Sequence, residues 1–491
     1  MRLIVGLLLA AAWGCALASM GADDARHLLN RTGFDARLEE VDAFAKLTRR
    51  EAVDRLLEGT RATARTPLPA GVAEWVSPRR IRELPADERK GAQMQARELG
   101  LELRGWWVAE MLATDSPLTE RMTLFWHNHF ATSLQKVRST ALMQRQNALL
   151  RRHAFGSFGE MLHAVSRDPA MLVYLDAARS RRGQPNENFA REVMELFTLG
   201  EGRYTERDVK EAARAFTGWS LDPDTGEYLF RAMLHDDGEK TVLGRTGAWR
   251  GEDVLDILLA RPETAEFIAG KLFREFVAPV AQSERDKRDV LRVARQFRES
   301  GYSIRAALRE MLSTESFWAP ENRAALVKSP AELVAGTLRQ FRIEVRDAAP
   351  FAIVMRNLGQ DLFAPPNVKG WPGGEAWINS RTLLARRQFL DRVLRVDEAR
   401  MAAQPTTMMQ PALGMQTPPQ GMQAPARRMV QAMADLQFSS RDWLRPYEGR
   451  AMPATAQRVL LAAAPHGEAA RSGQGLDLVR AIVADPVYQL R

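Results

Sequence analysis

The densest polar cluster of the sequence occupies residues 186–200. This run predicts a helix, because it starts with asparagine, a good N-cap residue, and ends with glycine, a common C-terminal cap. Asn188, Glu192 and Glu195 would share one face of that helix, and an arginine four residues before Glu195 can pair with it. Two carboxylates beside an amide suit a divalent cation or an acid/base pair; the alternative is a solvated face with salt bridges. The residues assigned to the candidate site from this segment are Asn186, Glu187, Asn188, Arg191, Glu192 and Glu195.

Three imidazoles add candidate ligands. His127 and His129 flank an asparagine in an aromatic run. Residues two apart on a helix point roughly 200° apart, so these two cannot bind one ion unless the helix ends there. We expect one of them to face a site and the other to be held in the core. His235 and Asp236 begin a predicted turn that leads to Lys240, where the alternative is ordinary hairpin chemistry.

A loop rich in glycine and proline at residues 365–379 contains Trp371 and Trp377. Indole rings can stack on sugar rings, and the two asparagines of this loop can bind sugar hydroxyls. The alternative is a rigid structural loop in which both indoles are buried.

Helices must position most of these residues, because apolar side chains recur at spacings of three and four. The fold class predicted is mainly α, a multi-helix globular domain. Ser329 and Glu332 form a capping box at the start of one helix. Thr205 and Asp208 resemble a second capping box, and this capping role accounts for Asp208 without a role in a site. The helices expected from periodicity cover residues 41–57, 158–165, 254–259, 265–276, 304–312 and 331–341.

One region departs from the helical pattern. Turn residues at 222–226 and 236–238 flank a short apolar run at 228–233. They predict a small β-hairpin or a three-stranded flap within residues 218–244. A calcium loop is excluded, because the glycine of the first turn occupies the fifth position instead of the sixth and no glutamate closes the loop.

The N-terminus has the order of a secretory signal peptide: Arg2 is followed by an apolar stretch and then by Ala16 and Ala18, which form a small-x-small cleavage site. We therefore expect residues 1–18 to be a cleaved signal peptide and the protein to be periplasmic or secreted. An alternative makes Cys15 the lipid-modified residue of a lipoprotein. Because Cys15 is the only cysteine, intramolecular disulfides and cysteine-based zinc or iron–sulfur sites are excluded.

Composition divides the remaining chain. Residues 23–400 form the expected main helical domain, and residues 401–428 are a low-complexity insertion rich in methionine, glutamine and proline. Its thioethers could hold Cu(I), although a disordered insertion grown from a slipped repeat is the plainer interpretation. Residues 429–491 are expected to return to the main domain as short helices. The chain has 45% hydrophobic and 26% charged residues, as is ordinary for a globular protein. Its 69 Lys and Arg residues are interleaved with 61 Asp and Glu residues, and this distribution leaves no basic stripe that would indicate nucleic-acid binding.

Several of these runs, in this order, resemble a bacterial family named "domain of unknown function 1800". Pro486 to Leu490 resembles the usual end of the family, and the insertion departs from its pattern. The matching segments are 29–34, 125–130, 168–172, 186–192, 195–200, 204–205 with Asp208, 216–219, 235–236 with Lys240 and Gly244, and 366–371. The resemblance implies an exported bacterial protein of no assigned activity. It also suggests a partner from a second exported family, "domain of unknown function 1501", which is similar to sulfatases and alkaline phosphatases.

Three hypotheses follow. One is a metal-dependent, hydrolase-like enzyme, with a divalent ion bound by His129, Glu192, Glu195 and His235 and a substrate oriented by Asn188, Arg191 and Lys240. The second is a non-catalytic accessory or polysaccharide-binding protein that acts with the exported partner through Trp371 and Trp377. The third treats the polar clusters as buried networks that fix helix packing.

Overall fold

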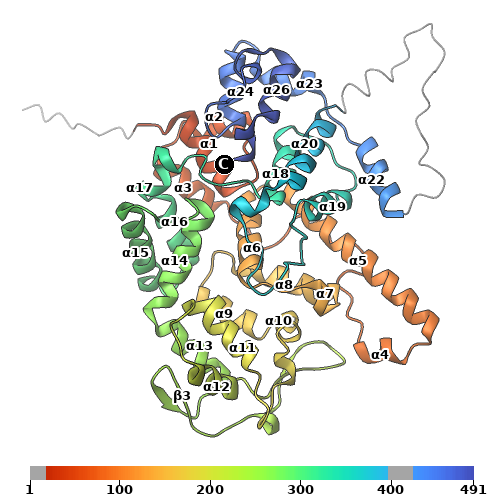
Figure 1. Ribbon diagram of the computed structural model, residues 1–491, viewed down its shortest axis with the longest axis vertical. Helices are drawn as coiled ribbons and strands as arrows, with labels where there is room; N and C mark the ends of the chain where they lie inside the picture. Colours follow the sequence, from red (N-terminus) through yellow and green to blue (C-terminus); the bar gives the residue numbers. More distant parts are fainter. Residues whose placement is uncertain (1–17, 396–423) are drawn as a thin grey trace, which may run out of the picture.

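Helices account for most of the chain in the computed structural model, which describes residues 18–395 and 424–491 (Figure 1). The mainly α fold class is confirmed. Cys15, the predicted signal peptide up to residue 17 and residues 401–423 of the predicted insertion lie outside the described residues. In the part that the structure describes, no helix is both long enough and apolar enough to cross a membrane.

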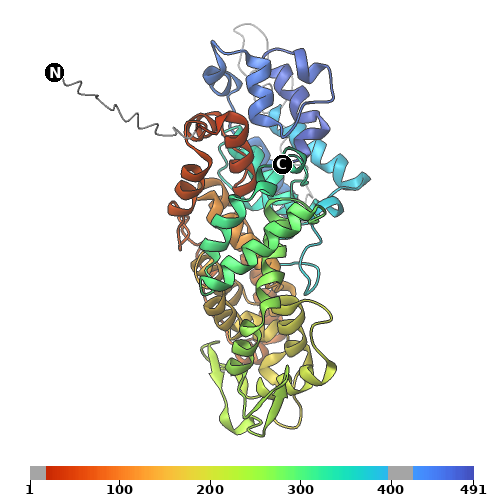
Figure 2. The same cartoon turned by 90° about the vertical axis from the view of Figure 1, so that its left-hand side faces the viewer.

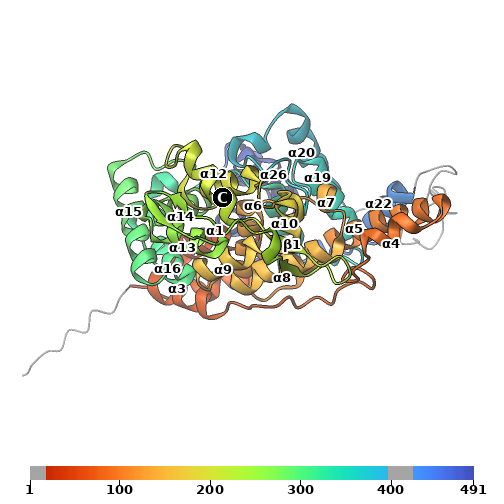
Figure 3. The ribbon, with the colours of Figure 1, turned by 90° about the horizontal axis from the view of Figure 1, so that it is seen from below.

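In the first third of the described chain, helices alternate with loops. The first helices are α1 (Gly21–Thr32), α2 (Leu38–Phe44), α3 (Arg49–Glu58), α4 (Pro78–Glu83) and α5 (Ala86–Ala113). They are followed by α6 (Pro117–His129), α7 (Leu134–Val137), α8 (Thr140–His153), α9 (Phe158–Ser166), α10 (Pro169–Tyr174) and the 3₁₀ turn η1 (Ala177–Arg179). Figure 3 shows α4 and the adjoining part of α5 projecting from the body.

The middle of the chain holds one irregular helix and the two hairpins. α11 (Glu187–Glu192) continues into the π-helix η2 (Val193–Leu199), and α12 (Glu206–Ala215) follows. β1 (Trp219–Leu221) pairs antiparallel with β2 (Tyr228–Phe230), and β3 (Lys240–Val242) pairs with β4 (Arg245–Gly247). The short turn η3 (Ala232–Leu234) connects the hairpins. The strands therefore form two separate hairpins in place of the single hairpin or three-stranded flap expected within residues 218–244. The second hairpin ends at residue 247, and the turn at 236–238 lies between the two hairpins.

The remaining helices build the other side of the body and one end. They are α13 (Gly251–Ala260), α14 (Pro262–Phe276), α15 (Glu284–Glu299), α16 (Ile304–Leu312), α17 (Glu315–Trp318), η4 (Pro320–Asn322), α18 (Pro330–Gln340), α19 (Ala349–Asn357), η5 (Gly374–Trp377) and α20 (Ser380–Leu394). The C-terminal group comprises α22 (Ala424–Ala434), α23 (Ser440–Leu444), η6 (Arg445–Tyr447), α24 (Met452–Leu460), α25 (Ala469–Ser472), α26 (Gly475–Ala484) and η7 (Pro486–Gln489).

The two ends of the described chain share one end of the elongated molecule, and the hairpins lie at the other (Figure 2). α24 contacts α1, and α26 contacts α20. The Trp443 indole donates to the backbone carbonyl of Gln340 at 2.9 Å, and Arg26 donates to that of Ala462 at 3.2 Å. The C-terminal helices therefore pack directly on the main helical body.

Local signals placed most helices correctly but missed one break. The helix expected over 304–312 has those bounds, and the Ser329 capping box starts α18. The single helix expected over 41–57 is wrong, because α2 ends at Phe44 and α3 starts after Thr48. The Thr48 hydroxyl accepts the Glu51 N–H at 3.2 Å and the Glu51 carboxylate accepts the Thr48 N–H at 2.8 Å, so a second N-terminus forms there.

Candidate functional site

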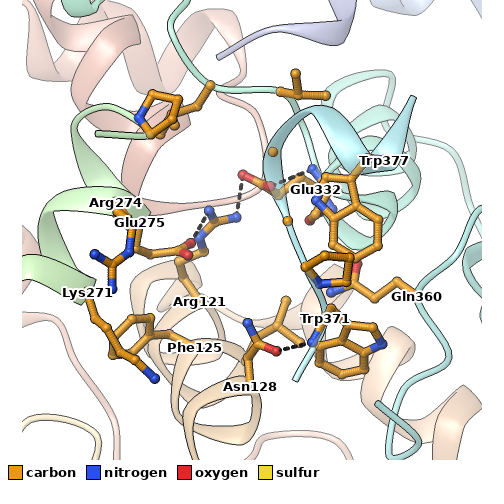
Figure 4. A pocket seen from close by; sticks show the side chains of 18 of the residues that line it. Arg121, Phe125, Asn128, Lys271, Arg274, Glu275, Glu332, Gln360, Trp371 and Trp377 are labelled. Carbon is orange, nitrogen blue, oxygen red and sulfur yellow. Dashed lines mark hydrogen bonds and ion pairs between the residues drawn. The ribbon is translucent and has the colours of Figure 1, made fainter. Parts of the chain in front are cut away.

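A cavity of about 320 Å³ lies where the end of α6 meets α14, the start of α18 and the loop 365–379. Two segments singled out separately by the sequence, the His127 run and the tryptophan loop, thus meet at one site. Figure 4 shows Lys271 and Arg274 on one side of the cavity and Gln360, Trp371 and Trp377 on the other. The polar side chains that line it are Arg121, Asn128, His129, Lys271, Arg274, Glu275, Ser329, Glu332, Gln360, Lys369 and Arg491.

Asn128 fixes the tryptophan loop to α6. Its Oδ1 accepts the backbone N–H of Trp371 at 2.6 Å (Figure 4). Gly370 has φ +85°, and a Cβ on it would lie 2.2 Å from that same oxygen. Only glycine therefore fits at this position, both for its left-handed backbone and for its close approach to Asn128.

The two histidines of α6 are both buried but point to different surroundings. The His127 ring lies 5.6 Å from each of the rings of Trp107, Phe363 and Trp371, and burial lowers its pKa to about 3. His129 lines the cavity, and burial followed by the Lys271 charge holds its pKa well below the usual range. Both imidazoles are therefore neutral at physiological pH.

Lys271 is the second cavity residue of unusual character. Its Nζ lies 2.9 Å from His129 Nδ1 and 3.4 Å from the Leu196 carbonyl oxygen, and 4.9 Å from the centre of the Phe267 ring. Burial, and secondarily the Arg274 charge, lowers its pKa from 10.5 to about 7. The amine is thus close to half neutral at physiological pH.

The π-helix provides the Leu196 contact. The Gly200 N–H bonds to the Glu195 carbonyl at 3.1 Å, five residues back, and the Thr198 hydroxyl donates to the Val193 carbonyl at 2.7 Å. Because the segment ends at residue 199, the Leu196 carbonyl has no partner within the helix and accepts from Lys271 instead. Short π-helical segments inside α-helices occur frequently at functional sites.

The two cavity carboxylates are already paired. Arg121 forms an ion pair with Glu275 at 2.5 Å and a second ion pair with Glu332. Arg491 Nε lies 2.6 Å from Glu332 Oε1. Although burial opposes ionisation, these two arginines hold the pKa of Glu332 below its usual value.

Two cavity cations have no such partner. Among the described residues, Arg274 forms no hydrogen bond or ion pair, and Lys271 forms no ion pair with a carboxylate. Lys369, at the rim, pairs with Glu201 at 3.1 Å, but both side chains are largely exposed. The cavity therefore presents uncompensated positive charge to any molecule that enters it.

The predicted polar helix lies beside this cavity and does not line it. Glu192 and Glu195 contribute to the raised pKa of Lys369, after Glu201, so this helix lies close to the rim. Burial and then Glu195 raise the pKa of Glu192, and Glu195 accepts a hydrogen bond from the Tyr204 hydroxyl. Asn186 caps α11 as expected, accepting the Phe189 N–H at 3.2 Å. Asn188 is exposed and Glu187 is partly exposed.

The expected pairing of Arg191 with Glu195 is wrong. Arg191 makes a bidentate pair with Glu206, with both distances at 2.7 Å. Glu206 is the first residue of α12, and both of its carboxylate oxygens bind the planar guanidinium of Arg191. Glu195, in the π-helix, instead accepts the hydrogen bond from the Tyr204 hydroxyl.

The residues around the hairpins form a separate network. His235 Nδ1 lies 2.9 Å from the Thr217 carbonyl, and Lys240 donates to the Gly238 carbonyl at 2.8 Å. Asp236 pairs with Arg214 at 2.8 Å, while Asp208 caps α12 and accepts the Leu243 N–H at 2.7 Å. These contacts attach the second hairpin to α12, and none of the four predicted residues lines the cavity.

The structure does not assemble the predicted metal site. His129 lies among aromatic rings, Glu195 bonds to Tyr204, and His235 is held by the Thr217 backbone. Across residues 18–395 and 424–491, no three His, Cys, Asp or Glu side chains form a group that could hold a metal ion. Local spacing placed Glu192 and Glu195 near each other but could not bring the histidines to them.

Trp371 and Trp377 both line the cavity, yet only 4% and 6% of their surfaces are exposed. The Trp371 ring packs 5.6 Å from that of His127. This burial leaves little indole surface for a sugar ring and agrees with the structural alternative for the loop.

Sequence reasoning missed the main cavity cations, Lys271, Arg274 and Arg491. The signal that could have identified two of them is the spacing of Lys271 and Arg274, which are three residues apart on the apolar helix α14 and therefore share one face.

No curated protein and no solved structure matches the chain. A family described as a protein of unknown function, DUF1800, matches residues 27–490. The match covers nearly the whole chain, and the protein therefore belongs to the DUF1800 family.

Proposed function

We propose that this DUF1800 protein is an exported protein that binds a small anionic ligand, with a carboxylate or phosphate group, in the cavity between α6, α14, α18 and the tryptophan loop. The observation that carries the proposal is Arg274, a cavity cation without a carboxylate partner among the described residues, next to the partly protonated amine of Lys271. The other cavity charges are balanced, since Arg121 and Arg491 pair with Glu275 and Glu332.

The surroundings favour an anion over a neutral ligand. A charge-assisted hydrogen bond is roughly twice as strong as a neutral one, and partial burial strengthens it further. Lys271 and Arg274 are three residues apart on α14, so both can contact one bound group. Trp377 and Gln360 bound the opposite side of the cavity and restrict the ligand to a small molecule (Figure 4).

The proposal replaces two finer interpretations of the sequence. The metal-dependent hydrolase requires ligands that the fold holds apart, and the sugar-binding protein requires indole surface that is buried. Export is supported by the order of charged, apolar and small residues over 1–18. A sulfatase- or phosphatase-like partner of the "domain of unknown function 1501" family remains part of the proposal, since such an enzyme releases small anions.

Titration calorimetry of the purified protein with inorganic phosphate tests this function. Arg274→Gln removes one unpaired cation and is expected to weaken phosphate binding about tenfold, the equivalent of one charge-assisted hydrogen bond. Arg295→Gln is the matched control, because Arg295 is exposed on α15 and does not line the cavity. Equal affinities for the protein and Arg274→Gln, or no binding of phosphate, sulfate or acetate at all, would contradict the proposal.

A further inference from the structure

Three lysines of the described chain are buried or nearly so, and they have different partners. Lys328 lies 2.8 Å from the Asp35 carboxylate and 4.1 Å from the centre of the Tyr488 ring. Lys240 donates to a backbone carbonyl in the hairpin network. Lys271 alone of the three lines the cavity, and it contacts a neutral imidazole and a carbonyl oxygen in place of a carboxylate.

This arrangement suits an uncharged amine. A neutral lysine has two N–H groups. His129 Nδ1 accepts one of them when the ring proton is on Nε2, and the Leu196 carbonyl oxygen accepts the other. The nitrogen lone pair then has no partner among the described residues. An ammonium group would carry a third N–H without an acceptor. The lowered pKa of Lys271 agrees with this geometry.

We propose that Lys271 forms a Schiff base with an aldehyde or ketone that carries an anionic group, which Arg274 holds one helical turn away. This inference rests on the proposed anion-binding function and names the class of ligand. Arg274 is free to bind the carboxylate or phosphate of the carbonyl compound, and its spacing on α14 places both groups on one face. A desolvated lysine next to another cation is a recurring arrangement for amine nucleophiles.

The reaction balances without an oxidant or reductant. The Nζ lone pair attacks the carbonyl carbon, a C–N bond forms, and the carbonyl π electrons move to oxygen. The amine loses both protons, the oxygen gains them and leaves as water, and a C=N bond remains. His129 Nδ1, which lies 2.9 Å from Nζ, is placed to accept a proton from the amine and return it to the departing oxygen.

Reductive trapping tests the inference. The full-length protein is incubated at pH 7 with glyoxylate and cyanoborohydride, and the modified lysines are located by peptide mass spectrometry. We expect Lys271 to be modified at least about tenfold faster than Lys287, an exposed lysine on α15, because a larger fraction of its amine is neutral. Lys271→Arg removes the adduct, and Lys287→Arg leaves it unchanged.

The same experiment with acetaldehyde separates the two proposals. Faster labelling of Lys271 by glyoxylate than by acetaldehyde supports both proposals. Equal labelling of Lys271 by the two aldehydes supports a reactive amine and overturns the anion site. If phosphate binds in calorimetry but glyoxylate modifies Lys271 no faster than Lys287, the Schiff base is overturned and the anion site stands. The comparison of Lys271 with Lys287 uses the protein without substitutions, so the test stays valid even if Lys271→Arg does not fold.

Discussion

Lys271 illustrates how the surroundings of one side chain change its chemistry. Its neighbours are an imidazole that burial keeps neutral, a carbonyl oxygen and an aromatic ring. The other charged groups that line the cavity are Arg274 on its own helix, Lys369 on the tryptophan loop, and the paired Glu275, Glu332, Arg121 and Arg491. None of these forms an ion pair with it, and desolvation therefore determines its pKa.

A neutral buried lysine makes stability depend on pH. The folded protein holds Lys271 at a pKa of about 7, whereas the unfolded chain has the ordinary value of 10.5. The unfolded state therefore binds more protons, and the cost of burial is fully present below about pH 7 and fades as the pH rises toward 10.5. Lys271→Met is expected to increase the free energy of unfolding by about 3 kcal/mol more at pH 6.5 than at pH 9.5.

Thermal unfolding at the two pH values measures this difference. Lys287→Met is the control, because that side chain is exposed and its replacement is expected to change stability little at either pH. An effect of Lys271→Met that is identical at both pH values would show that the amine is charged in the folded protein.

At the scale of elements, the cavity depends on the attachment of the tryptophan loop to α6, to which a hydrogen bond and a close approach both contribute. Asn128, at the end of α6, accepts the Trp371 N–H, and Gly370 packs directly against its side chain. Gly373 in the same loop also has a positive φ, +73°, but nothing lies within 4 Å of a Cβ placed there. The two glycines therefore share a positive φ, and only Gly370 contacts Asn128.

Substituting each glycine separates backbone strain from this contact. Both Gly370→Ala and Gly373→Ala place an alanine at positive φ, which costs on the order of 1–3 kcal/mol. Gly370→Ala must also displace Asn128, so we expect it to lower the free energy of unfolding by about 2 kcal/mol more than Gly373→Ala does. Chemical denaturation checks the difference, and equal losses for the two variants would mean that the loop is not anchored through Asn128.

Local sequence signals predicted elements better than they predicted irregularities. The Asn186 cap, the Ser329 capping box and the strand at Tyr228–Phe230 follow from a few adjacent residues. The π-helix was not predicted, because it depends on tertiary contacts such as that of Lys271 with Leu196. The break between α2 and α3 carried a local signal, the capping box at Thr48, which the apolar periodicity concealed.

At the scale of the whole molecule, the cavity is assembled from segments far apart in the sequence. Arg121 of α6 pairs with Glu275 of α14 and Glu332 of α18, and Arg491 pairs with the same Glu332. Residue spacing within one helix cannot reveal such a network, so the sequence placed its candidate site on Glu192 and Glu195 beside the cavity. It identified the two runs that meet there, but not the cations between them.

A crystal structure of the protein with bound selenate tests the central claim most directly, because selenium gives an anomalous signal that locates the anion. We expect a selenate within hydrogen-bond distance of Lys271 Nζ and the Arg274 guanidinium, and its loss from crystals of Arg274→Gln. Selenate ordered only at other sites, with none in the cavity at concentrations where the protein binds phosphate, would show that the cavity is not an anion site.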